Sequence, residues 1–163
     1  MKEQSNLEGE MKMEKEKVID SFFGEYRWLS NFYPCEVKYE GITYPTVEHA
    51  YQAAKTRDTE IRKRIAYLPK PGQAKREGRK IQIRGNWEFI KISTMEQLLE
   101  QKFTQPKFKK LLLETKGIRL IEGNKWGDIF WGMCEGRGAN YLGGLLMNIR
   151  KKQISLEREQ NGK

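Results

Sequence analysis

Apolar residues recur at two spacings along this chain, and each spacing predicts a different kind of element. Over Val37–Tyr39 and Ile42–Tyr44 apolar and polar positions alternate around a Glu40-Gly41 turn, which predicts a β-hairpin. Beyond Pro45 apolar residues recur every three or four positions, which predicts helices. Helices are expected over 46–55, 59–66, 86–91, 94–103 and 106–115, with a short basic helix or turn over 73–79.

Local signals set the expected ends of these helices. Thr46 and Asn86 are candidate N-caps, and Thr94 with Gln97 has the spacing of a capping box that would begin a separate helix. Gly117 is expected to stop the helix that begins at Pro106.

The last third of the chain combines short strands with one long helix. Ile118–Glu122 and Asp128–Gly132 predict short buried strands around a turn, and a glycine-rich loop follows them. Asn140 is expected to cap a final helix that frays beyond Arg150. Because helices outnumber strands, the expected fold class is α+β, a single compact, mainly helical domain with a small sheet.

Charge separates a folded body from charged ends. Residues 1–17 are rich in charge and lack aromatic residues, so we expect a disordered tail, a domain over 18–150 and a charged helix end or tail over 151–163. The formal net charge is +9, from 31 Lys+Arg against 22 Asp+Glu, which favours anionic partners.

With no apolar run of membrane-spanning length and no apolar signal segment, we expect no membrane partner and a cytoplasmic protein. Nothing in the sequence indicates an oligomeric state.

The cysteines and the single histidine give no sign of a metal site. Cys35, His49 and Cys134 lie far apart along the chain, so neither zinc-ligand spacing nor a disulfide framework is present. We therefore expect free thiols and no metal.

One predicted helix carries a stripe of polar side chains. Glu48, Gln52 and Lys55 are spaced i, i+4 and i+7 and so share a face. On spacing alone, a solvent-exposed salt-bridge face is the better interpretation, and a catalytic pair is the alternative.

A basic cluster precedes a tryptophan. Lys75, Arg79 and Arg84 could bind a phosphate while Trp87 stacks on a ring. A solvated basic surface beside a core tryptophan is the simpler alternative.

Asp128 lies between Trp126 and Trp131, where aromatic walls could exclude water and place an anion beside an oxocarbenium-like transition state. An aspartate that only forms a turn fits the sequence equally well. The glycine-rich segment 136–144 is likewise either a phosphate cradle or a tight turn.

Together these motifs resemble those of a known family. They are Phe22-Phe23, Leu29–Phe32, Tyr44–His49 with Gln52–Lys55, Ala74-Lys75 with Gly78-Arg79, Arg84 with Asn86-Trp87, Asp128 with Trp131-Gly132, and Asn140 with Leu142-Gly143 and Leu146-Met147. In this order, from about Phe22 to Arg150, they are similar to the NADAR family, the YbiA-like N-glycosidases. One departure is Trp126-Gly127, since relatives have more polar and shorter segments before the aspartate.

The resemblance implies an enzyme without metal or redox cofactor that cleaves the N-glycosidic bond between a base-like ring and a phosphorylated ribose. Characterised relatives act on early phosphorylated intermediates of riboflavin biosynthesis, releasing ribose 5-phosphate, or on ADP-ribose attached to guanine in nucleic acid. The expected partner is thus a small phosphorylated ribosyl substrate, with ADP-ribosylated nucleic acid as the alternative.

The resemblance also implies which residues form the site. The expected catalytic residues are Glu48, Asp128 and Lys55, and the expected substrate-binding residues are Asn31, Arg79, Arg84, Trp87, Trp131 and Asn140.

Two mechanisms remain open. Either Glu48 or Asp128 activates water while the other stabilises the oxocarbenium ion, or Lys55 captures C1 of the ring-opened sugar as a Schiff base, which requires a partly deprotonated amine. A non-catalytic nucleotide or ADP-ribose binding module is the alternative of another class, although a pure binder has no need of carboxylates near a phosphate.

Overall fold

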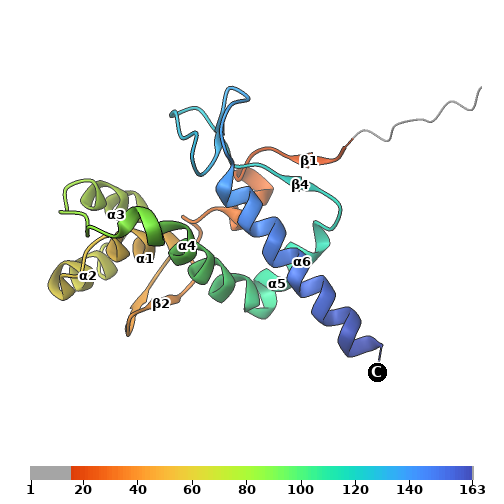
Figure 1. Cartoon of the computed structure of the whole chain (residues 1–163), viewed down its shortest axis with the longest axis horizontal. Coiled ribbons are helices and arrows are strands. Elements are labelled where there is room, and N and C mark those ends of the chain that lie inside the picture. Colours follow the sequence, from red (N-terminus) through yellow and green to blue (C-terminus); the bar gives the residue numbers. More distant parts are fainter. Residues whose placement is uncertain (1–15, 163) are drawn as a thin grey trace, which may run out of the picture.

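The structure is a computed structural model that describes residues 16–162. Within this range it is a single, mainly helical α+β domain, as predicted (Figure 1). The helices are η1 (Gly24–Leu29), a 3-10 helix, and α1 (Val47–Ala54), α2 (Thr59–Ala66), α3 (Pro71–Gly78), α4 (Trp87–Thr104), α5 (Pro106–Glu114) and α6 (Tyr141–Asn161). The strands are β1 (Val18–Ile19), β2 (Val37–Tyr39), β3 (Ile42–Tyr44), β4 (Arg119–Leu120), β5 (Gly123–Asn124) and β6 (Met133–Cys134).

The strands form short pairs in the described part of the chain. β2 and β3 form the predicted antiparallel hairpin, with Val37 opposite Tyr44, and both turn residues have positive φ, 43° at Glu40 and 82° at Gly41. β1 pairs with β4 in parallel, and β5 pairs with β6 in parallel. The β1–β4 pair therefore joins the N-terminal end of the domain to the segment that follows α5.

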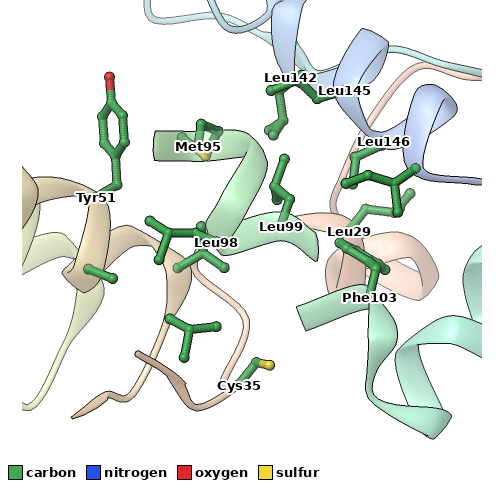
Figure 2. Packing of buried hydrophobic residues seen from close by; sticks show 14 of the residues in the cluster. Leu29, Cys35, Tyr51, Met95, Leu98, Leu99, Phe103, Leu142, Leu145 and Leu146 are labelled. Carbon is green, nitrogen blue, oxygen red and sulfur yellow. The ribbon is translucent and has the colours of Figure 1, made fainter. Parts of the chain in front are cut away.

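Helix α4 forms the centre of the core. It packs against α1 on one side and against α5 and α6 on the other (Figure 1). Leu98 and Leu99 are fully buried, and Figure 2 shows Leu99 between Leu98 and the α6 side chains Leu142 and Leu146. The apolar stripe predicted for 94–103 is therefore confirmed as the face around which the other helices gather.

The expected break before Thr94 is wrong, because α4 runs without interruption from Trp87 to Thr104. Thr94 is 4% exposed and lies in the middle of the helix. An N-cap needs a non-helical backbone, whereas packing of the turns on both sides keeps this segment helical, so tertiary contacts outweigh the local capping signal.

The expected strand over Asp128–Gly132 is also wrong, because this segment is a turn and the strand lies at Met133–Cys134. The Asp128 carboxylate Oδ1 accepts hydrogen bonds from the backbone N–H groups of Phe130 (3.1 Å) and Trp131 (2.9 Å). An aspartate side chain that bonds the backbone ahead of it stabilises a turn in place of a strand.

The final helix differs from expectation at both ends. Asn140 occupies the N-cap position, but its backbone is left-handed (φ 52°) and its side chain makes no cap hydrogen bond. The helix does not fray at Arg150 but continues to Asn161. Arg150 donates to the carbonyl of Thr115 (2.6 Å) and Gln153 donates to that of Phe103 (2.6 Å), and these buried contacts hold the helix to the domain beyond the predicted end.

Most of the predicted N-terminal tail, residues 1–15, lies outside the described residues. At its end the carbonyl of Lys17 accepts a hydrogen bond from the backbone of Arg119 (2.9 Å). No helix within 16–162 is long and apolar enough to cross a membrane.

Candidate active site

A cavity of about 880 Å³ opens where α1 and α3 meet the segments around residues 22–33 and 122–131. Its polar wall holds three carboxylates and five cationic side chains: Glu48, Glu122 and Asp128, with Arg27, Lys55, Lys75, Arg76 and Arg79. Aromatic rings form much of the remainder: Phe22, Phe23, Phe32, Tyr33, Tyr51, Trp126 and Trp131. The volume is typical of sites for small organic ligands.

The first turn of α1 places Glu48 in this cavity. The Thr46 hydroxyl caps the helix by accepting from the backbone N–H of His49 (3.1 Å), as predicted, and the backbone N–H of Glu48 donates to the carbonyl of Asn31 (3.1 Å). Glu48 is 7% exposed, and its Oε1 accepts from Gln52 Nε2 (2.7 Å). The polar stripe is thus not a solvated salt-bridge face but a buried hydrogen-bonded pair.

Burial sets the protonation of Glu48. It raises the pKa of this carboxyl, and the negative charge of Asp128 raises it further. The hydrogen bond from Gln52 and the charges of Lys75 and Lys55 act in the opposite direction. A carboxyl of this kind holds and releases a proton closer to neutral pH than an exposed one does.

Lys55 follows the last turn of α1 and faces the same space. Burial lowers the pKa of its ammonium group, and the neighbouring charges of Lys75 and Arg79 lower it further, while Glu48 opposes them. Its Nζ lies 5.6 Å from the centre of the Tyr51 ring. The environment therefore favours the neutral amine more than water does, which is the condition for a nucleophilic lysine.

The Asp128 carboxylate both forms the turn and lines the cavity. Oδ1 is occupied by two backbone N–H groups, and the backbone N–H of Asp128 donates to Asn124 Oδ1 (3.0 Å). Asn124 in turn donates to the carbonyl of Asp128 (2.7 Å). These bonds fix the carboxylate in place and confirm the turn-forming interpretation, and the carboxylate also lines the cavity.

Aromatic rings form an inner wall and an outer rim. Inside, Trp131 packs edge-on against Tyr51, with ring centres 5.5 Å apart. At the mouth, the exposed rings of Trp126 and Phe23 meet edge-on at 6.3 Å. Lys75 Nζ lies 5.6 Å from the centre of the Trp126 ring, so a cation and an exposed indole occur together at the entrance.

Six of the nine predicted site residues line the cavity: Glu48, Asp128, Lys55, Asn31, Arg79 and Trp131. The other three, Arg84, Trp87 and Asn140, are not part of its wall.

These three residues contact neighbouring segments and do not line the cavity. Trp87 is 4% exposed and packs behind Tyr51, with ring centres 5.1 Å apart. Arg84 donates to Asn86 Oδ1 (2.8 Å). Asn140 accepts from the backbone N–H of Glu122 (3.0 Å) and lies outside the cavity. Each of these contacts supports a neighbouring segment.

The glycine-rich segment is a tight turn and not a phosphate cradle. The backbone of Cys134 bonds that of Arg137 in both directions (2.8 and 3.0 Å), and Gly138 lies so close to Gly132 that a Cβ atom would meet its carbonyl oxygen at 2.3 Å. None of the residues 134–144 lines the cavity.

Glu122, Lys75 and Trp126 line the cavity but were absent from the predicted site. A signal existed for Glu122, which is a carboxylate at the end of a predicted buried strand, where a charge is costly. Trp126 departs from the family pattern, and Lys75 belongs to the basic cluster noted in the sequence. Within residues 16–162, no three His, Cys, Asp or Glu side chains are arranged to hold a metal ion.

Comparison with known proteins decides the family. A family model described as the NADAR domain matches residues 20–153. The chain belongs to the NADAR domain family. It is 38% identical over 138 residues to the N-glycosidase YbiA of Escherichia coli strain K12, covering 82% of this chain and 85% of that protein. It is 34% identical over 134 residues to an N-glycosidase of Nostoc punctiforme, covering 78% and 85% respectively.

A solved structure and a longer relative extend the comparison of this NADAR domain. The NMR structure of E. coli YbiA superposes with a TM-score of 0.77 at 36% identity, covering 89% of both chains. A riboflavin biosynthesis protein of Vibrio vulnificus is 32% identical over 128 residues, which cover 77% of this chain and 35% of that protein. The resemblance, the α+β fold and the enzyme class, an N-glycosyl hydrolase, are thereby confirmed.

Proposed function

We propose that this NADAR domain hydrolyses the N-glycosidic bond between a base-like ring and a phosphorylated ribose. The observation that carries the proposal is the composition of one cavity, in which Glu48 and Asp128 face aromatic walls and a group of cations. A phosphorylated ribosyl compound has three parts, a phosphate, a sugar and a ring, and each finds a complementary wall here.

The cations suit the phosphate. Lys75 and Arg76 come from one short helix, α3, Arg79 is the C-cap of that helix, and Arg27 comes from η1. Guanidinium groups bind phosphate oxygens through paired, charge-assisted hydrogen bonds. The phosphate therefore binds toward α3, which leaves the sugar between it and the carboxylates.

The carboxylates suit the reacting carbon. Breaking the C1–N bond leaves positive charge on C1 and the ring oxygen, and a nearby anion stabilises that charge. Asp128, fixed by backbone hydrogen bonds, supplies the anion. Glu48, with its raised pKa, accepts the proton of an attacking water. Lys55 is the alternative attacking group, because its environment favours the neutral amine.

The names of two relatives support a small-molecule substrate. Both relatives carry riboflavin biosynthesis in their names, the protein of Vibrio vulnificus and a chloroplastic protein of maize. We therefore propose phosphorylated intermediates of riboflavin biosynthesis as substrates, with release of ribose 5-phosphate. ADP-ribose attached to guanine in nucleic acid is the second candidate, favoured by the net charge of +9.

A direct assay separates these possibilities. Purified protein is incubated in parallel with phosphorylated riboflavin intermediates, with an ADP-ribosylated guanine oligonucleotide and with NAD, and the released base is measured by mass spectrometry. We expect release from the riboflavin intermediates. Release only from the oligonucleotide would establish the second candidate, and binding without release from any of the three would indicate a non-catalytic binding module.

A further inference from the structure

Glu122 is a third carboxyl group in the cavity, and the roles proposed for Glu48 and Asp128 do not use it. It follows β4 and lies just before β5, and it lines the cavity together with Glu48 and Asp128. Its Oε2 atom is buried and has no hydrogen-bond partner among residues 16–162. A buried polar atom without a partner is costly, which argues for a functional reason to keep this carboxyl group at the cavity wall.

The backbone of Glu122 is held from both sides. Its N–H donates to Asn140 Oδ1 (3.0 Å), and its carbonyl accepts from the N–H of Met133 (2.8 Å). Gly132 approaches the same carbonyl so closely that a Cβ atom would lie 2.2 Å from it. The backbone that carries this side chain is therefore fixed before a ligand binds, as expected of a preorganised site.

Burial and two neighbouring carboxylates favour the protonated form of Glu122. Burial raises its pKa to about 8, and the neighbouring carboxylates Asp128 and Glu48 add to the increase, while Lys75 opposes it. Near neutral pH this favours a protonated Glu122 beside Glu48 and Asp128. Carboxyl groups whose environments differ can divide the roles of acid and base between them.

We propose that Glu122 is the acid that protonates the departing ring nitrogen. This inference rests on the proposed function, since it assigns a step of that reaction. The C1–N bond breaks with its electron pair on nitrogen, and the Glu122 carboxyl proton moves to that nitrogen. Water supplies the hydroxyl group that C1 gains, and Glu48 takes the proton that the water loses. The products are the free amine or base and ribose phosphate, and proton exchange with solvent restores both carboxyl groups.

The test compares two leaving groups in the wild type and in Glu122→Gln. The first substrate is a phosphoribosyl compound with an N-linked ring that the wild type cleaves. The second is 4-nitrophenyl riboside 5-phosphate, whose nitrophenolate leaves without a proton. We expect Glu122→Gln to slow release of the N-linked ring by roughly 10² or more and to change release of nitrophenolate only a few fold. Glu114→Gln, an exposed carboxylate on α5, serves as the matched control and should leave both rates unchanged.

The pH dependence gives a second readout. Wild-type turnover of the N-linked substrate should fall as the pH rises past about 8, where Glu122 ionises, and this fall should be absent from the residual activity of the variant. Because the folded-state pKa is raised above the ordinary value of 4.5, wild-type stability should decline between about pH 4.5 and pH 8 relative to the variant, and the difference in Tm should stay constant above that.

The outcomes separate the two levels of the proposal. Equal losses on both substrates in Glu122→Gln, or turnover of the N-linked ring within a few fold of wild type, would overturn the acid role alone. A wild type that releases a ring from no N-linked phosphoribosyl compound would overturn the proposed function and the acid role with it.

Discussion

At the scale of single residues, the cavity is defined by charges that burial has shifted toward neutrality. Burial raises the pKa values of Glu48 and Glu122 and lowers that of Lys55. Each shift means that the charged form is destabilised in the folded protein. Such shifts cluster at functional sites, which supports the proposal that these residues take part in the reaction.

Lys55 allows the two routes to C1 to be distinguished. If it attacks the sugar, borohydride added during turnover should trap the sugar on Lys55, and Lys55→Arg should abolish both the adduct and base release, because a guanidinium group is no nucleophile. If water attacks, no adduct forms and Lys55→Arg mainly raises KM. We expect direct attack by water, since Lys55 and Glu48 are separated by seven residues, about 10.5 Å of helical rise. A trapped peptide containing Lys55 would contradict that expectation.

Lys102 carries a shifted pKa although it does not line the cavity. Its side chain is fully buried and donates to the carbonyl of Ser30 (2.9 Å), and burial lowers its pKa to about 7. Because the folded-state pKa lies below the ordinary 10.5, wild-type stability should rise with pH from about 7 to 10.5. The Tm of Lys102→Met relative to wild type should therefore be highest below pH 7 and decline toward pH 10.5. Exposed Lys110→Met is the control, and a pH-independent difference for Lys102→Met would be the contrary result.

At the scale of elements, the approach of α3 to α1 fixes the buried Glu48–Gln52 pair. Gly78, in the last turn of α3, lies against Gln52, and a Cβ atom there would meet Gln52 Oε1 at 1.9 Å and its Cβ at 3.1 Å. Gln52 is 4% exposed and cannot swing into solvent. The glycine therefore allows two short helices to hold a polar pair at the cavity wall.

Substitution of this glycine tests the contact. Gly78→Ala should lower the free energy of unfolding by about 1–3 kcal/mol through overpacking, which exceeds the stabilisation expected from the higher helix propensity of alanine. It should also reduce turnover by displacing Gln52 from Glu48. Gly85→Ala is the control, because nothing lies within 4 Å of its added methyl group. Thermal melting and turnover are measured together, and equal effects of the two substitutions would argue against the contact.

The rim formed by the 123–131 segment gives a second element-scale test. Trp126 is 54% exposed at the cavity mouth, so Trp126→Ala should leave Tm unchanged and raise KM several fold by removing a surface on which the ring of the substrate can stack. Phe89→Ala, an 89% exposed aromatic residue on α4, should alter neither quantity. An unchanged KM in Trp126→Ala would show that the rim does not contact the substrate.

Elements with strong local signals were predictable, and elements set by distant contacts were not. The β2–β3 hairpin and helix α1 follow from alternation, a turn with positive φ and the Thr46 cap. The continuity of α4 through Thr94 depends on helices packed against both sides of it. The turn at Asp128 depends on a choice of hydrogen-bond partner that the spacing of apolar residues does not encode.

At the scale of the whole molecule, the cavity is assembled from segments separated by up to about a hundred residues. Glu48, Lys55 and Asp128 were predictable as candidate site residues through the resemblance to the family, because the helical spacing of Glu48 and Lys55 alone favoured a solvated face. Glu122 was not, because its exposure to the cavity depends on Asn140 and Gly132, which hold the chain from the far side. Sequence motifs identified residues in and around the cavity but did not separate those that line it from those packed behind it.

The most direct test of the account is base release by Glu48→Gln from the substrate that the wild type cleaves. The amide fills the same volume and can still accept from Gln52, so circular dichroism should be unchanged. Base release should fall by roughly 10²–10⁴, because the variant lacks the group that accepts a proton from water. Glu114→Gln controls for loss of a carboxylate elsewhere. Turnover of Glu48→Gln within a few fold of wild type, with an intact fold, would contradict the assignment of this cavity as the active site.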